Sequence, residues 1–176
     1  MIYLVRHGET DWNKEDRIQG KADIKLNSIG VNQAQEVAEK LKNIKFNCVY
    51  CSPRTRAVET CKIISANDII LDERLSERDF GSYEGSIIDR GGSFSEMWDE
   101  KKEHMFPDVE TLSEVNKRVS SFLDEMKEKH NKDDNVLIVC HGGTGFFVKL
   151  YFCGKPANGD YKWYLLANGE VATFSL

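Results

Sequence analysis

The sequence predicts an α/β fold, a three-layer α/β/α sandwich with a mostly parallel central sheet. Four short apolar runs lack polar alternation, which is typical of strands buried on both faces of a parallel sheet. Between these runs lie segments in which apolar residues recur every three or four positions, as they do along one face of a helix. Strands and helices that alternate along a chain form layered α/β sheets.

The four predicted buried strands span residues 2–5, 46–51, 69–71 and 136–140. Two further strands are predicted near the end of the chain, at residues 161–166 and 171–175. Asn168-Gly169 lies between them, and Asn-Gly is a favoured two-residue turn of β-hairpins. The last two strands are therefore expected to pair as a hairpin.

Three segments have helical spacing, and two of them begin with a recognisable cap. Asn27-Ser28 precedes the first, and Thr111 with Glu114 forms a capping box before the third. The apolar positions are Val31, Ala34, Ala38 and Leu41 in the first helix, Ala57, Cys61 and Ile64 in the second, and Leu112, Val115, Val119, Phe122 and Met126 in the third. These helices are predicted to cover the sheet.

Length and composition indicate one globular domain over residues 1–176. The chain has 176 residues, enough for a single sizeable core, and no repeat or linker divides it. Its net charge of -5 is unlike that of nucleic-acid binders, which carry a basic patch, so no nucleic-acid partner is expected. The apolar run at the N-terminus is too short for a signal peptide or membrane span. A cytoplasmic protein with no membrane partner is expected, while its oligomeric state is left open.

Five cysteines are present, and Cys48 and Cys51 have CxxC spacing. The pair lies inside a predicted strand, and no second pair completes a zinc site. Buried, reduced thiols are therefore expected rather than a metal or redox site. No ligand pair of the HxH, DxD or HExxH type is present, so neither a metal nor a cofactor is expected.

Charged and polar residues directly follow three predicted strands. Arg6-His7-Gly8 follows the first, a run with Arg54 and Arg56 follows the second, and His141-Gly142-Gly143 follows the fourth. The carboxyl ends of parallel strands meet at one edge of the sheet, where open α/β sheets bind ligands. Two histidines and at least two arginines should converge there. Glycine after each histidine would let the backbone approach a ligand, and a helix after His141 would point free amides at an anion.

Five motifs in order resemble the histidine phosphatase superfamily, also called phosphoglycerate mutase-like. The matching segments are Leu4-Val5-Arg6-His7-Gly8-Glu9-Thr10 with Trp12-Asn13; Arg17-Ile18-Gln19-Gly20 with Asp23, Leu26, Gly30 and Gln33-Ala34; Ser52-Pro53-Arg54-Thr55-Arg56-Ala57; Leu75-Ser76-Glu77 with Gly81 and Glu84-Gly85; and His141-Gly142-Gly143. They cover most of the chain. The resemblance implies a metal-independent phosphoryl-transfer enzyme with a phosphohistidine intermediate and a small phosphomonoester as its partner.

The resemblance implies a role for each catalytic position. His7 would be the nucleophile, which requires a neutral ring. Arg6, Arg56 and His141 would hold the phosphoryl oxygens, since phosphoryl transfer depends on positioning and charge stabilisation. Glu77 would protonate the leaving alkoxide and then activate water.

Four further positions are expected to bind substrate by the same resemblance: Asn13, Gln19, Gly20 and Arg78. For Arg78 a surface ion pair is the alternative. Arg54 takes a position usually held by leucine in the family, and is expected to support the site or to face the substrate.

The motifs do not separate a phosphatase from a mutase. Mutases of the family are associated with a longer insertion over the site and an extra C-terminal tail, whereas here the lid insertion, residues 86–107, is short and the chain ends soon after the last predicted strand. Hydrolysis of α-ribazole phosphate or a sugar phosphate is therefore expected. Mutase chemistry and a non-catalytic phospho-ligand binder are the alternatives.

Four residues have roles that the sequence leaves open. The lid residues Phe94, Met97 and Trp98 are expected either in the hydrophobic core of the lid or in contact with substrate. Glu110 is expected in a structural or a catalytic role.

Overall fold

A central sheet organises the computed structural model, which describes residues 1–155 and 164–176. Within these residues the sheet has five strands, in the order β3-β2-β4-β1-β5. The strands are β1 (Ile2–Arg6), β2 (Cys48–Cys51), β3 (Ile70–Leu71), β4 (Val136–Cys140) and β5 (Val171–Phe174). β1 to β4 pair in parallel and β5 is antiparallel to β1, which confirms the predicted mostly parallel sheet.

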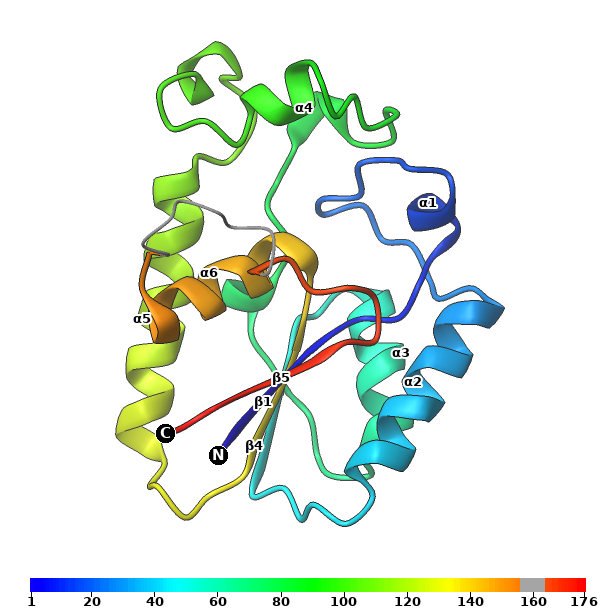
Figure 1. The fold of residues 1–176 in the computed structure, drawn as a ribbon, viewed down its shortest axis with the longest axis vertical. Coiled ribbons are helices and arrows are strands. Elements are labelled where there is room, and N and C mark those ends of the chain that lie inside the picture. Colours follow the sequence, from blue (N-terminus) through cyan, green and yellow to red (C-terminus); the bar gives the residue numbers. More distant parts are fainter. Residues whose placement is uncertain (156–163) are drawn as a thin grey trace.

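Helices cover both faces of the sheet, as Figure 1 shows. The longer ones are α2 (Ser28–Leu41), α3 (Thr55–Ile64), α5 (Leu112–Lys129) and α6 (Gly142–Cys153). α2 and α3 lie on one face, and α5 and α6 lie on the other. The predicted three-layer α/β/α sandwich is confirmed.

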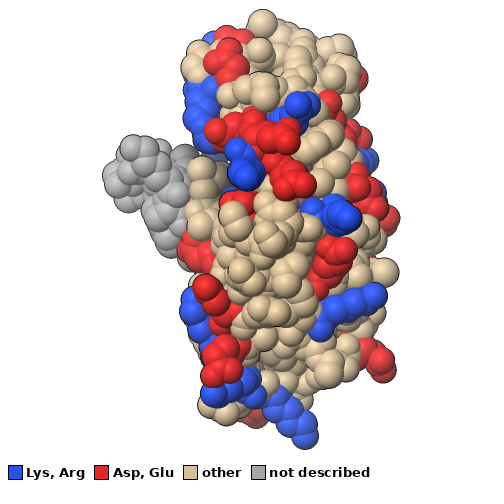
Figure 2. All heavy atoms as spheres, turned by 90° about the vertical axis from the view of Figure 1, so that its right-hand side faces the viewer, with Lys and Arg blue, Asp and Glu red and all other residues tan. Residues whose placement is uncertain are grey.

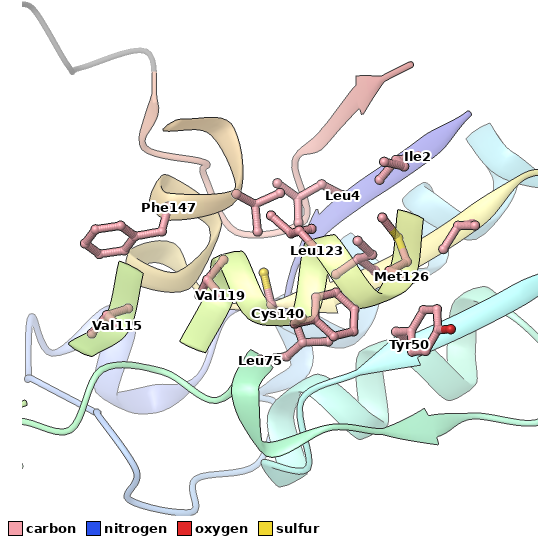
Figure 3. Close-up of a cluster of buried hydrophobic side chains, with 14 of the residues drawn as sticks. Ile2, Leu4, Tyr50, Leu75, Val115, Val119, Leu123, Met126, Cys140 and Phe147 are labelled. Atoms are coloured by element: carbon pink, nitrogen blue, oxygen red, sulfur yellow. The ribbon is translucent and has the colours of Figure 1, made fainter. Parts of the chain in front are cut away.

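Side chains of the central strand β4 alternate between the two helical layers. Leu137 and Val139 pack in the cluster beneath α2 and α3, whereas Val136, Ile138 and Cys140 pack beneath α5 and α6. Figure 3 shows the second cluster, in which residues of α5 lie over those of β1, β2 and β4. Because both faces are buried, every residue of β4 is apolar or a thiol, and the strand shows no polar alternation.

Two predicted caps start their helices. The Asn27 side chain accepts a hydrogen bond from the Gly30 amide at 2.9 Å, and Thr111 and Glu114 form the capping box of α5. All five predicted apolar positions of α5 are buried. In α2 the buried face contains Val37, with Ala38 at its margin.

The predicted hairpin at the end of the chain is wrong in the part that the structure describes. Residues 161–163 lie outside the described residues, and residues 164–166 form no strand. The Leu166 carbonyl instead accepts a hydrogen bond from the Arg6 side chain at 2.7 Å. The turn at Asn168-Gly169, with Gly169 at φ 69°, leads into β5, and β5 pairs with β1 rather than with its predicted hairpin partner.

The CxxC cysteines lie on opposite faces of β2. Cys48 packs toward the α5 and α6 side, and Cys51 packs toward α2 and α3. All five cysteines are free thiols, although Cys153 is exposed and Cys48 is only half-buried. Alternation along a strand sends residues three apart to opposite faces, so this spacing does not bring the two thiols together.

The predicted lid, residues 86–107, lies above the carboxyl ends of the strands, near α1 (Asp11–Lys14) (Figure 1). It contains the short helix α4 (Ser93–Glu96) and the 3-10 turn η3 (Glu103–Met105). Two more 3-10 turns, η1 (Glu73–Leu75) and η2 (Gly81–Tyr83), precede it. A small hydrophobic core, which we call the lid core, joins the lid to neighbouring segments; it consists of Met97 and Phe106 of the lid with Ile18, Phe80 and Val109.

The surface carries charges of both signs. On the face in Figure 2, basic and acidic side chains lie among one another. Several are paired, as Arg90 is with Asp16 at 2.6 Å. In the described part of the chain, every helix is too short or too polar to cross a membrane.

Candidate active site

The ends of three strands bring the predicted residues together. His7 follows β1, His141 follows β4, and Ser52 follows β2, which leads into α3 and its Arg56. The two imidazole rings lie 5.1 Å apart, centroid to centroid, at an angle of 62°. Both histidines and Arg56 are buried. Residues distant in sequence therefore form one cluster at the carboxyl edge of the sheet.

Arg56 is the centre of this cluster. Its Nε–H points between His7 Nε2 at 3.3 Å and His141 Nδ1 at 3.2 Å. The two terminal nitrogens donate to the carbonyls of Gly20 and Ala22, each at 2.7 Å. A guanidinium with no exposed surface is thus held on three sides, with one edge toward both imidazoles.

The hydrogen bonds of His7 define its tautomer. Nδ1 lies 2.7 Å from the Gly8 carbonyl oxygen, which can only accept, so Nδ1 carries the proton. Nε2 faces the Arg56 donor and keeps its lone pair. This is the arrangement that an imidazole nucleophile requires.

His141 has the opposite tautomer. Its Nδ1 accepts from Arg56, so Nε2 carries the proton and donates to Ser52 Oγ at 2.7 Å. The ring is fully buried and is not part of the cavity lining. In this structure His141 contacts Arg56 on the side away from the cavity and accepts a hydrogen bond from its Nε.

Burial and neighbouring charge keep both rings neutral. Burial lowers the pKa of His7 well below 6.5, and the charges of Arg56 and Arg6 lower it further. The pKa of His141 is lowered in the same way, first by burial and then by Arg56. Burial also lowers the pKa of Arg56 to about 10, which leaves it charged at neutral pH. The site is therefore cationic through its arginines and not through its histidines.

Arg6 has a donor without a partner. One terminal nitrogen donates to the Leu166 carbonyl, but the buried Nε has no hydrogen-bond partner in the described structure. Arg6 lines the cavity beside His7. A buried, unpaired donor on a cation is costly unless an acceptor arrives, and an anion at this position would supply one.

Glu77 occupies the N-terminus of α6. Its carboxylate accepts hydrogen bonds from the amides of Gly143 at 2.9 Å and Thr144 at 3.1 Å, and from the Arg78 amide at 2.9 Å. The expectation that these helix amides are free for a ligand is therefore wrong. They bind the protein's own carboxylate, which lies at the cavity wall.

Gly142, which directly follows His141, lines the cavity, and a Cβ there would lie 3.3 Å from Arg6 Cζ. Gly8 and Gly143 make room for neighbouring protein groups. A Cβ on Gly8 would lie 2.3 Å from the Gly30 carbonyl oxygen of α2. A Cβ on Gly143 would lie 2.5 Å from Glu77 Oε1. Gly8 lets α2 approach the end of β1, and Gly143 lets Glu77 reach α6.

Asn13, Gln19 and Gly20, predicted to bind substrate, all line the cavity. Sequence reasoning assigned no role to Glu84, which organises this side. Its two carboxylate oxygens accept from the amides of Lys21 at 2.7 Å and Ala22 at 2.8 Å. Glu84 thereby shapes the loop whose carbonyls hold Arg56, and the family motif at Glu84-Gly85 was the signal that pointed to it.

Arg78, predicted to bind substrate, lies elsewhere. Its side chain is buried and donates to the carbonyls of Glu110 at 2.6 Å and Met97 at 2.7 Å, and it is not part of the cavity lining. Its position directly after Glu77 turns it away from the cavity, under the lid. Neither the substrate contact nor the surface ion pair describes it.

Two other residues left open by the sequence have structural contacts. The Glu110 carboxylate pairs with Arg118 at 2.6 Å and accepts from the Asp79 amide at 3.1 Å. Arg54 pairs with Glu73 at 3.0 Å, beside the entrance to α3. Glu110 and Arg54 are both absent from the cavity lining.

A cavity of about 1000 Å³ lies between the cluster and the lid. Phe94 and Trp98 line it, whereas Met97 is fully buried in the lid core. In the described residues, no group of three or more His, Cys, Asp or Glu side chains is arranged to hold a metal ion.

We expect the rings of His7 and His141 to remain neutral as the pH falls from about 7.5 to about 6. Their pKa values are lowered, so each ring gains its proton only at pH values well below 6.5. Below pH 6.5 the unfolded chain then binds more protons than the folded one, and stability should fall as the pH falls.

Long-range ¹⁵N NMR spectra, assigned with His7→Gln and His141→Gln, will check this expectation. His7 should show a protonated Nδ1, and His141 a protonated Nε2. A titration midpoint at or above 6.5 for either ring would contradict the assigned neutral state.

Comparison with known proteins gives a consistent family. A family profile described as the histidine phosphatase superfamily (branch 1) matches residues 2–176. The putative phosphoserine phosphatase 2 of Hydrogenobacter thermophilus is 36% identical over an alignment of 151 residues that covers 81% of this chain and 73% of that protein. The probable phosphoglycerate mutase GpmB of an Enterobacter species is 36% identical over an alignment of 168 residues that covers 90% of this chain and 77% of that protein.

A solved structure has the same architecture. It is phosphoserine phosphatase from Entamoeba histolytica in complex with 3-phosphoglyceric acid, 28% identical in sequence. The similarity has a TM-score of 0.80 and covers 97% of this chain and 87% of that one. With the profile match over nearly its whole length, the chain belongs to the histidine phosphatase superfamily (branch 1).

Proposed function

We propose that this protein is a phosphomonoester hydrolase that transfers the phosphoryl group of a small phosphorylated metabolite to His7 and then to water. The observation that carries the proposal is the neutral His7 ring, whose Nδ1 donates to the Gly8 carbonyl and whose Nε2 keeps a lone pair beside two arginines. The neighbouring cavity provides room for an ester substrate.

The reaction has two displacement steps. In the first, His7 Nε2 attacks phosphorus and the bond to the ester oxygen breaks, while Glu77, which enters this step in its protonated form, gives its proton to the leaving alkoxide. In the second, water attacks the phosphohistidine, the N–P bond breaks, and Glu77 takes a proton from the water. The products are inorganic phosphate and the alcohol, and both His7 and Glu77 return to their starting states.

The arginines supply positive charge to the transferred group. Arg56 is held by backbone carbonyls and is already oriented before substrate arrives, and Arg6 keeps an unpaired buried donor. Preorganised donors stabilise the charge of the transition state without reorganisation. Asn13, Gln19 and Gly20 line the same end of the cavity, which supports a role in substrate binding. No cofactor or metal takes part in this scheme.

The substrate class is a small phosphomonoester, with α-ribazole phosphate and sugar phosphates as candidates. The similarity to a putative phosphoserine phosphatase supports hydrolysis. The similarity to a probable phosphoglycerate mutase favours a second candidate, phosphoryl transfer within one substrate. A short lid over a large cavity supports access of water to the phosphohistidine, and therefore hydrolysis. Because His7, Glu77 and His141 are all present, a non-catalytic binder is disfavoured.

His7→Ala should abolish turnover and the labelled phosphoenzyme, since the substitution removes the attacking nitrogen. In wild-type protein, rapid quenching after mixing with ³²P-labelled ester should trap phosphate that is stable to base and labile to acid. His130→Ala is the matched control, because His130 contacts Tyr50 and Asp134 instead of the cavity. Label that persists in His7→Ala would assign the nucleophile elsewhere.

Glu77→Gln should slow turnover of alkyl phosphates by roughly 10²–10⁴-fold, the usual scale of general acid catalysis. The loss should be smaller for p-nitrophenyl phosphate, whose leaving group needs little protonation. Glu103→Gln is the matched control, since the Glu103 carboxylate also accepts a helix amide, from Leu112 at 2.8 Å, outside the cavity lining. Equal losses on the two substrates would count against the acid role.

The proposal as a whole is tested by phosphate release from a panel of phosphomonoesters in EDTA, with isomerisation of 3-phosphoglycerate assayed in parallel. Release without isomerisation, undiminished by EDTA, is the expected result. Faster isomerisation than release would establish the mutase alternative. Clear inhibition by EDTA that added metal reverses would replace the metal-independent scheme.

A further inference from the structure

Aromatic rings form a continuous wall from the lid to α6. Phe80 stacks on Phe94 at 5.9 Å, Phe94 meets Trp98 at 6.3 Å, and Trp98 meets Phe146 of α6 at 6.2 Å, all between ring centroids. All four rings line the cavity. We call these four residues the aromatic wall.

The aromatic wall stands beside the group that would protonate the leaving oxygen. A Cβ added to Gly143 would lie 2.5 Å from Glu77 Oε1 and 3.0 Å from Trp98 Cη2. The carboxylate and the indole therefore flank the same backbone atom. A group attached to an ester oxygen next to Glu77 would therefore lie near Trp98.

The wall is fixed before substrate binds. The Arg78 guanidinium lies 5.4 Å from the Phe80 ring centroid and 5.2 Å from that of Trp98. Its hydrogen bonds to the Met97 and Glu110 carbonyls join the lid to the start of α5. Cation–π contacts at a buried arginine hold both rings in place. A ligand therefore meets a surface that is already ordered, which reduces the entropy cost of binding.

The other apolar residues of the lining extend this surface. Ile88 of the lid and Leu165, which is 57% exposed, both line the cavity. Arg17 and Arg90 line it too, but they are paired with Glu15 and Asp16 at 2.6 Å each. The unpaired Arg6 donor lies beside His7, at the phosphoryl end. Asp99, Glu100, Lys101 and Lys155 also line the cavity, so its charged and apolar residues are both represented. The apolar part is the aromatic wall with Ile88 and Leu165, and to this part the hydroxyls of a sugar would contribute little.

We propose that the natural substrates are phosphomonoesters of alcohols that carry an aromatic ring or a branched apolar group near the ester oxygen. This inference rests on the proposed function, because it names the leaving group at the same site. Trp98 and Phe146 are the residues that select it, by burying the apolar group while His7 and the arginines hold the phosphate.

The test compares 2-phenylethyl phosphate with ethyl phosphate, whose leaving alcohols are chemically alike at the oxygen. In wild-type protein, kcat/KM for 2-phenylethyl phosphate should exceed that for ethyl phosphate tenfold or more. The anionic ester 3-phosphoglycerate is included because Lys101 also lines the cavity, and it should be a poorer substrate than 2-phenylethyl phosphate. The ratio does not depend on the fraction of folded enzyme. Binding of 2-phenylethylphosphonate and ethylphosphonate, measured by calorimetry, gives the same comparison without turnover.

Phe146→Ala should lower the phenylethyl-to-ethyl ratio at least threefold, both for kcat/KM of the esters and for binding of the phosphonates. Phe146→Leu should lower the two ratios less. Phe152→Ala is the matched control: Phe152 is also a half-buried phenylalanine of α6, but it stacks on Phe174 at 4.9 Å, away from the cavity lining. Phe152→Ala should leave both ratios unchanged.

If both esters are hydrolysed at equal kcat/KM, or 3-phosphoglycerate is preferred, the inference is wrong and the proposed function stands. If phenylethylphosphonate binds preferentially but no ester is hydrolysed, the proposed function fails and the apolar site remains.

Discussion

The site depends on one constraint, the burial of the Arg56 guanidinium. A cation without exposed surface must have its donors satisfied, because an unpaired buried charge costs several kcal/mol. Arg56 meets this requirement with the carbonyls of Gly20 and Ala22 and with the two imidazoles. The ends of β1 and β4 are thereby joined to α3 and to the loop at residues 20–22, and Glu84 holds that loop in turn.

Burial, together with the charge of Arg56, also explains the chemistry of the histidines. Because solvent is excluded, and because Arg56 and Arg6 are close, the rings remain neutral. The backbone contact to Gly8 decides which nitrogen of His7 keeps a lone pair. On the opposite side Glu77 is bound to amides of α6. The arginines, the neutral imidazoles and the Glu77 carboxyl group thus have separate positions around one cavity. Backbone hydrogen bonds hold Arg56, His7 and Glu77.

Much of the fold and the positions of the site residues could be predicted because they depend on local patterns. Apolar runs without alternation marked β1, β2 and β4, which lie inside the sheet, and the capping box at Thr111 marked the start of α5. The run at residues 69–71 also forms a strand, but its predicted burial is wrong, because β3 is an edge strand whose Ile70 and Leu71 are exposed. Family motifs marked His7, Arg56 and Glu77 by residue type and order. The strand at residues 161–166 was wrong over its described part, because the Leu166 carbonyl is held by Arg6, more than 150 positions away in the sequence. No local pattern carries a contact of that range.

Hydrophobic periodicity and ordered motifs are enough to specify the layers of the sandwich, the strand ends at which functional residues gather, and the family. The contacts of each group became visible only in the folded chain. Arg78 lies under the lid instead of against substrate, and amides of α6 donate hydrogen bonds to Glu77. Contacts in the folded protein also set the tautomers of both histidines. The physical reason is that hydrogen bonds and desolvation act between neighbours in space, and in this fold those neighbours come from distant parts of the chain.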